Sequence, residues 1–174
     1  LSLSSLCLCV PLHCTHNGTQ GVVDVEERSN SGMTPFLLAC SSVGKIEYLE
    51  TVGASDSAIE TATGLTALHM ACMKGYTAGI ELFLERGFDA NAVTSDGWTP
   101  LMLAAMARAT SGSSPAAHLE LLLSKGAELE AQSSEHLTPL CYAVLSGLSY
   151  NVEVVRSFHP ALGSFVLLTR ATVA

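Results

Sequence analysis

The chain has 174 residues, of which 48% are hydrophobic but only 6% are aromatic. This length allows one domain with a continuous core, and the scarcity of aromatic residues favours close helix–helix packing over a β-sandwich. With 8 basic and 16 acidic residues the formal charge is -8. That charge argues against a nucleic-acid partner, because neutralising phosphates requires clustered Lys and Arg.

The start of the chain contains an apolar run that is shorter than the roughly 20 residues of a membrane helix, and no basic leader precedes it. The donor atoms available there for zinc belong to Cys7, Cys9, His13, Cys14 and His16. Their spacing fits no closed zinc pattern, so we predict no metal site. We expect residues 1–20 to be a disordered or non-native leader. Because no Met opens the chain, we also expect a fragment, a processed product or an imperfect gene model.

One segment recurs four times along the chain. Its copies are GMTPFLLAC from Gly32, GLTALHMAC from Gly64, GWTPLMLAA from Gly97 and HLTPLCYAV from His136. Successive copies are 32, 33 and 39 residues apart, and the six extra residues fall in a polar, small-residue stretch. We predict that this stretch, 108–118, is an inserted loop. Four matches at one period predict an array of similar units.

The start of each unit is typical of a helix N-terminus. A Thr side chain caps a helix, and a Pro one position later suits the first turn. The pair occurs as Thr34-Pro35, Thr99-Pro100 and Thr138-Pro139, while the second unit has Thr66-Ala67. We therefore predict that each of these Thr residues caps a helix.

The second half of each unit is predicted to form another helix. Ile80, Phe83 and Leu84 fall at i, i+3 and i+4, which places them on one helical face. The pattern is weaker in the first unit. There we predict a shortened, displaced second helix, with Ile46 and Leu49 as its apolar pair.

The units resemble ankyrin repeats over residues 21–160, because each combines a Thr-Pro-Leu-like start, a Leu-rich second helix and a polar loop ending near Gly. The resemblance implies an all-α fold, an ankyrin-repeat solenoid of stacked helix-turn-helix units with short β-hairpin loops. The predicted ranges are 1–20 for the leader, 21–31 for a partial unit, 32–63, 64–96, 97–135 and 136–160 for four repeats, and 161–174 for a C-terminal tail.

The chain departs from the family pattern in three places. The family's TPLH tetrapeptide is never complete: only His69 occupies its fourth position, and there Ala67 replaces the Pro. The resemblance implies that His69 is structural and joins neighbouring loops by hydrogen bonds. His136 stands where the other units have Gly. Arg156 stands where other repeats have Leu, so we predict a terminal cap at 136–160 whose end face is open to water. We expect the tail either to fold back over the last helix or to be disordered.

The strongest candidates for partner binding are Met33, Leu65, Trp98 and Leu137, which follow the loop Gly or His in successive units. The resemblance places them on the concave surface, at the base of the projecting loops. We predict an apolar row anchored by Trp98, so that Trp98→Ala weakens binding by a few kcal/mol at a cost in stability of about 1 kcal/mol or less. The alternative is local packing against the loops or the insertion. The predicted polar rim consists of Asn30, Ser31, Thr63, Asp96 and Glu135, whose residue types also suit tight turns.

The acidic residues follow predicted helix surfaces and loops as a solvated face would, so we predict no catalytic residue, no metal and no cofactor. We expect a cytoplasmic monomer that acts as an adaptor and binds another protein, with no nucleic acid and no membrane insertion. The insertion is predicted to widen or gate the binding surface. The alternative is a targeting module of a larger enzyme, such as a kinase or ubiquitin ligase, or of a channel.

Overall fold

The computed structural model describes residues 26–30, 32–40, 42–51, 53–55, 63–109 and 114–159. Within these ranges it contains eight helices and no strand, which confirms the predicted all-α class. The helices are α1 (Pro35–Ala39), α2 (Val43–Thr51), α3 (Ala67–Met73), α4 (Thr77–Glu85), α5 (Pro100–Met106), α6 (Ala117–Ser124), α7 (Pro139–Leu145) and α8 (Ser149–Phe158). None of these described helices has the length and apolar content needed to cross a membrane.

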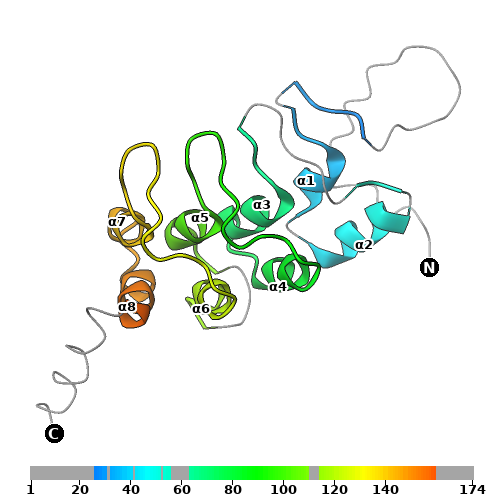
Figure 1. Ribbon diagram of the computed structural model, residues 1–174. Coiled ribbons are helices and arrows are strands. Elements are labelled where there is room, and N and C mark those ends of the chain that lie inside the picture. Colours follow the sequence, from blue (N-terminus) through cyan, green and yellow to red (C-terminus); the bar gives the residue numbers. More distant parts are fainter. Residues whose placement is uncertain are drawn as a thin grey trace, which may run out of the picture.

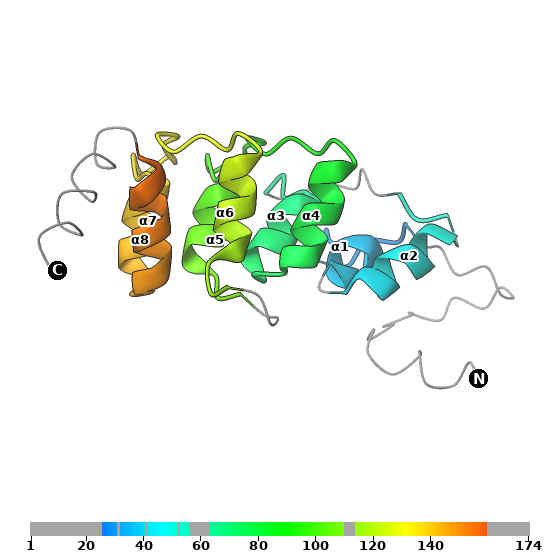
Figure 2. The same cartoon turned by 90° about the horizontal axis from the view of Figure 1, so that it is seen from below.

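The helices stack as pairs in chain order (Figure 1). We call α1, α3, α5 and α7 the inner helices and α2, α4, α6 and α8 the outer helices. Each inner helix packs against its own outer helix and against the inner helix of the next pair. Figure 2 shows α3 to α8 with roughly parallel axes and the connecting loops along one edge of the stack. In such a solenoid each pair is stabilised by its neighbours rather than by a central core.

Three of the four predicted Thr caps are present. The side-chain oxygens of Thr34, Thr66 and Thr99 each accept a hydrogen bond of 3.4 Å from the backbone N–H three residues later. The prediction is wrong for Thr138, whose hydroxyl caps no N–H and instead donates to Cys141 Sγ at 3.5 Å. Helix α7 still begins at Pro139, because the proline ring fixes a helical φ.

The prediction of a shortened second helix in the first unit is wrong. The first helix of that unit, α1, has five residues, whereas the second, α2, has nine. Twelve residues separate Thr34 from the buried Ile46, whereas fourteen separate Thr66 from the buried Ile80. Compared with the second unit, the first unit is therefore shorter at the end of α1 and in the turn that follows it, while α2 keeps its full length.

The core is a continuous aliphatic layer between successive helix pairs, with one aromatic cluster near its N-terminal end. Phe83 of α4 is fully buried, and its ring centroid lies 6.2 Å from that of Phe36 and 5.2 Å from that of Phe88. Because Phe36 belongs to the first helix pair, this cluster joins two repeats. Its residues bury more apolar area than the small side chains elsewhere in the stack.

The loops between repeats are tight turns that contain no strand in the described residues. Two backbone hydrogen bonds close each turn. Before α5, Thr94 N–H donates to the Trp98 carbonyl at 3.0 Å and Gly97 N–H donates to the Thr94 carbonyl at 3.0 Å. Before α7, the equivalent bonds run from Ser133 N–H to the Leu137 carbonyl at 3.1 Å and from His136 N–H to the Ser133 carbonyl at 2.9 Å. His136 occupies the left-handed region with a φ of 58°, where Gly stands in the other repeats.

Candidate functional site

Neighbouring loops are joined into one row by backbone hydrogen bonds. Ser95 N–H donates to the Thr63 carbonyl at 2.9 Å, and Ser134 N–H donates to the Asp96 carbonyl at 3.1 Å. The loops rise from the N-terminal ends of the inner helices, which Figure 1 shows nearly end-on. The loops and the inner helices thus meet at a steep angle and form two sides of one surface, which we call the inner surface.

The predicted apolar row lies at the corner of the inner surface, where loop meets helix. Met33, Leu65, Trp98 and Leu137 are all half-buried and pack against the core. Part of each side chain therefore serves local packing, which was the alternative to partner binding. Partner binding by the exposed part of these side chains stays a prediction.

Trp98 has a specific role in joining two repeats. Its ring centroid lies 4.4 Å from that of Tyr142 on α7, with an angle of 35° between the planes. Tyr142 is buried, and its hydroxyl lies 2.9 Å from Ser133 Oγ in the next loop. Stacked aromatic pairs stabilise beyond their buried area. Sequence reasoning missed this contact because Trp98 and Tyr142 are far apart along the chain.

The predicted polar rim is only partly exposed. Asn30, Asp96 and Glu135 are exposed at the loops, whereas Thr63 is half-buried and its carbonyl accepts the bond from Ser95. Ser31 lies outside the described residues. The two exposed carboxylates, Asp96 and Glu135, make the loop side of the inner surface acidic.

A second apolar row lies on the inner helices, and sequence reasoning missed it. Met73, Met106 and Leu145 each end an inner helix, and each lies seven residues after the Thr at the start of its repeat. They are 41%, 39% and 69% exposed. Because α3 packs against α5 and α5 against α7, the shared register places the three side chains in line. Aligning the repeats position by position would have shown a large apolar residue at this place in three consecutive units.

His69 is structural, as the family resemblance implies. It is fully buried, its Nδ1 accepts from Thr66 N–H at 3.2 Å, and its Nε2 lies 3.1 Å from the Ala92 carbonyl. This pattern requires the neutral tautomer with the proton on Nε2. The ring thus joins the start of α3 to the loop that follows α4.

The two buried histidines predict acid sensitivity. Burial lowers the pKa of His69 and of His118 below the ordinary value of 6.5, although each also bonds a backbone carbonyl, which acts in the opposite direction. The unfolded chain therefore binds more protons below about pH 6.5. We expect the free energy of unfolding to fall as the pH drops from roughly 7.5 to 5.5, with uptake of up to one proton per histidine. Urea denaturation at several pH values measures this. If the pH dependence is unchanged in the His69→Gln, His118→Gln double variant, its source is elsewhere.

The described residues contain no group of three His, Cys, Asp or Glu side chains arranged to hold a metal ion. The buried thiols have no reactive character, since burial raises the pKa of the Cys40 thiol to about 12 and also raises the pKa of Cys72. Cys7, Cys9, His13, Cys14 and His16, which we predict not to form a metal site, lie outside the described residues.

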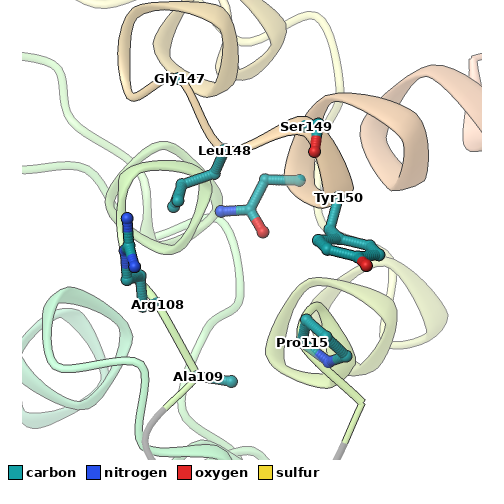
Figure 3. Close-up of a pocket in the computed structure, with 8 residues that line it drawn as sticks. Arg108, Ala109, Pro115, Gly147, Leu148, Ser149 and Tyr150 are labelled. Carbon is teal, nitrogen blue, oxygen red and sulfur yellow. The ribbon is translucent and has the colours of Figure 1, made fainter.

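An open pocket of about 410 Å³ lies at the opposite ends of the helices from the loops. Figure 3 shows Arg108 on one side of it and Pro115 and Tyr150 on the other. The remaining lining residues are Ala109, Gly147, Leu148, Ser149 and Asn151. They include no acid–base pair, so the pocket supplies no catalytic constellation. Residues 110–113 of the predicted insertion lie outside the described residues, and its gating role remains a prediction.

Comparison with known proteins identifies the family. Residues 49–133 match the ankyrin repeats family in three copies, a range that runs from the end of α2 through α3 to α6. The chain is an ankyrin-repeat protein. Families of this kind act generally as interaction modules without catalytic activity.

The ankyrin-repeat chain is also similar to a regulatory protein. A segment of 43 residues is 51% identical to Protein phosphatase 1 regulatory subunit 12A of Mus musculus and of Rattus norvegicus. A segment of 38 residues is 50% identical to the Homo sapiens protein of that name. These segments are 25% and 22% of this chain but only 4% of each relative. They are little longer than one repeat, so the similarity reflects the repeat framework more than a shared binding surface.

Proposed function

We propose that this ankyrin-repeat chain is an adaptor or scaffold that binds a partner protein on its inner surface. The observation that carries the proposal is the row formed by Met73, Met106 and Leu145, which leaves large apolar side chains open to solvent at one register of three repeats. A monomeric surface rarely exposes apolar residues in line without a use for them. Methionine adapts its shape to a partner more easily than branched side chains do.

The acidic loops extend the proposal to the charge of the partner. Asp96 and Glu135 are exposed beside the apolar residues, and the whole chain carries a formal charge of -8. A partner with a basic or neutral face is therefore favoured, mainly through a faster encounter. Such binding needs one copy of the chain and no cofactor or catalytic residue.

The alternative is a regulatory or targeting module within a larger enzyme or channel. The similarity to a phosphatase regulatory subunit, of which the matching segment is only 4%, favours this possibility. It uses the same inner surface, because the targeting module also works by binding. Co-purification of a catalytic or channel polypeptide with the chain distinguishes a targeting module from a free adaptor.

We further propose a cytoplasmic location. Cys40, Cys72 and Cys141 are free thiols in the described structure, and the first two are buried in the core. Thiols of this kind persist in a reducing compartment. Imaging of the tagged protein tests the location directly.

A photo-crosslinking amino acid tests the binding surface. Placed at position 106 on the inner surface it is expected to capture one specific protein from cell extract, whereas at the exposed position 85 of α4 it captures none. For the captured protein, the triple variant Met73→Ser, Met106→Ser, Leu145→Ser is expected to raise Kd about tenfold or more. The matched control replaces the exposed Glu81, Glu85 and Glu120 of the outer helices by Ser. Equal affinities for the two triple variants would rule out the inner surface.

A further inference from the structure

The far face of the last helix pair has the residues of a repeat–repeat contact, but none of the described residues packs on it as a further repeat. Val144 of α7 lies six residues after Thr138, the position that Cys72 and Ala105 occupy in the two preceding repeats. Those two residues are 0% exposed, whereas Val144 is 59% exposed. Among the described residues nothing packs beyond α7 and α8 (Figure 1).

Helix α8 contributes the same kind of surface. Val152 corresponds to Ile80 and Leu119, which are fully buried in their repeats, but Val152 itself is only half-buried. Together with Val144 it lines a shallow groove of about 420 Å³, completed by Gly147, Ser149, Glu153 and Arg156. We call this groove the end face. It combines two apolar side chains with one acidic and one basic side chain.

We propose that the end face binds a second copy of this chain, with Glu153 of each copy paired to Arg156 of the other. A two-fold interface brings a surface against itself, so it needs complementary groups on the same surface. Glu153 and Arg156 lie three residues apart on one helix face and are both exposed. Antiparallel contact of two α8 helices brings each glutamate to the partner copy's arginine and makes both ion pairs at once.

Charge also argues for a second copy over one more repeat. Arg156 stands where Leu84 and Leu123 lie half-buried in earlier repeats. A further ankyrin repeat would cover this position and desolvate the guanidinium. Earlier repeats carry Glu81 and Glu120 at the position of Glu153, but both glutamates stay exposed within the stack instead of being covered by a neighbouring repeat. A second copy supplies Glu153. The sequence predicts a monomer and a terminal cap open to water, but the exposed Val144 and the half-buried Val152 make the end face apolar between its two charges.

The contact area is that of one helix pair, which is small for a permanent dimer. We therefore expect reversible self-association that depends on concentration. Light scattering after gel filtration, in reducing buffer over roughly 5 to 500 µM, is expected to show the mass rising from the 18.2 kDa of one chain toward twice that value.

Exchanging the charges of Glu153 and Arg156 tests the proposed ion pairs directly. Arg156→Glu alone and Glu153→Arg alone are each expected to hold the mass at one chain, and the double exchange is expected to restore the dimer. Glu120→Arg, at the position equivalent to Glu153 two helices earlier, is the matched control and should leave the dimer intact. A single-chain mass at all concentrations overturns the proposal, as does a double exchange that fails to recover. If a dimer forms only after residues 161–174 are removed, the tail covers the end face and the proposal is wrong.

Discussion

Gly75→Ala is expected to lower the free energy of unfolding by about 3 kcal/mol or more. Gly75 ends the turn after α3 with a φ of 64°, a conformation that L side chains rarely adopt. A Cβ built there overlaps the carbonyl oxygen of Arg108, lies 2.7 Å from its carbonyl carbon and lies 3.3 Å from Ala109 Cα. Both neighbours are backbone atoms, so relief requires moving the chain that follows α5 rather than rotating a side chain.

Gly87→Ala is the matched control for this clash. Gly87 has a φ of 84°, but a Cβ there meets nothing within 4 Å. We expect Gly87→Ala to lower the free energy of unfolding by about 1 kcal/mol, because it has only the unfavourable backbone conformation and no clash. Urea denaturation followed by circular dichroism compares the two. Equal losses would mean that the turn of the second repeat does not touch the segment after α5.

The regular features of the fold could be predicted because the same residue pattern occurs in every repeat. The Thr residues at 34, 66, 99 and 138 and the period between them predict where the inner helices begin, and all four helices start one residue later. The repeat period predicts where an inner helix begins even in the repeat whose Thr does not cap the helix. Thr138 caps nothing, yet α7 begins at the expected place because the neighbouring inner helix and Pro139 position it.

The errors arise where a repeat differs from its neighbours or where contacts cross between repeats. The deletion in the first unit removes residues from α1, but a weak apolar pattern around Ile46 suggested a defect in α2. The stacking of Trp98 on Tyr142 joins two repeats, and no pattern within either repeat encodes it. Met73, Met106 and Leu145 share one position in three consecutive repeats, whereas the residues predicted to bind a partner all lie at or beside the loops.

Trp98→Ala is expected to lower the free energy of unfolding by about 2–3 kcal/mol, more than the 1 kcal/mol expected from sequence. The substitution removes a half-buried indole and uncovers the ring of Tyr142, which is only 3% exposed. The loop before α5 then loses its main contact with α7. Urea denaturation measures this loss. A weakened affinity for the captured partner is expected as well. The alanine variant alone does not show whether the loss comes from a missing contact with the partner or from a displaced loop.

Trp98→Phe separates the two roles of this side chain. A phenyl ring keeps the stacking on Tyr142, so we expect less than half of the stability loss of the alanine variant. The phenyl ring lacks the indole N–H and the second ring, so a partner that contacts the exposed part of Trp98 should still bind several-fold more weakly. If Trp98→Phe and Trp98→Ala both bind as tightly as the unmodified chain while only stability falls, Trp98 serves the core alone. Partner binding would then rest on Met73, Met106 and Leu145, which lie farther along the inner helices and are the more exposed of the two apolar rows.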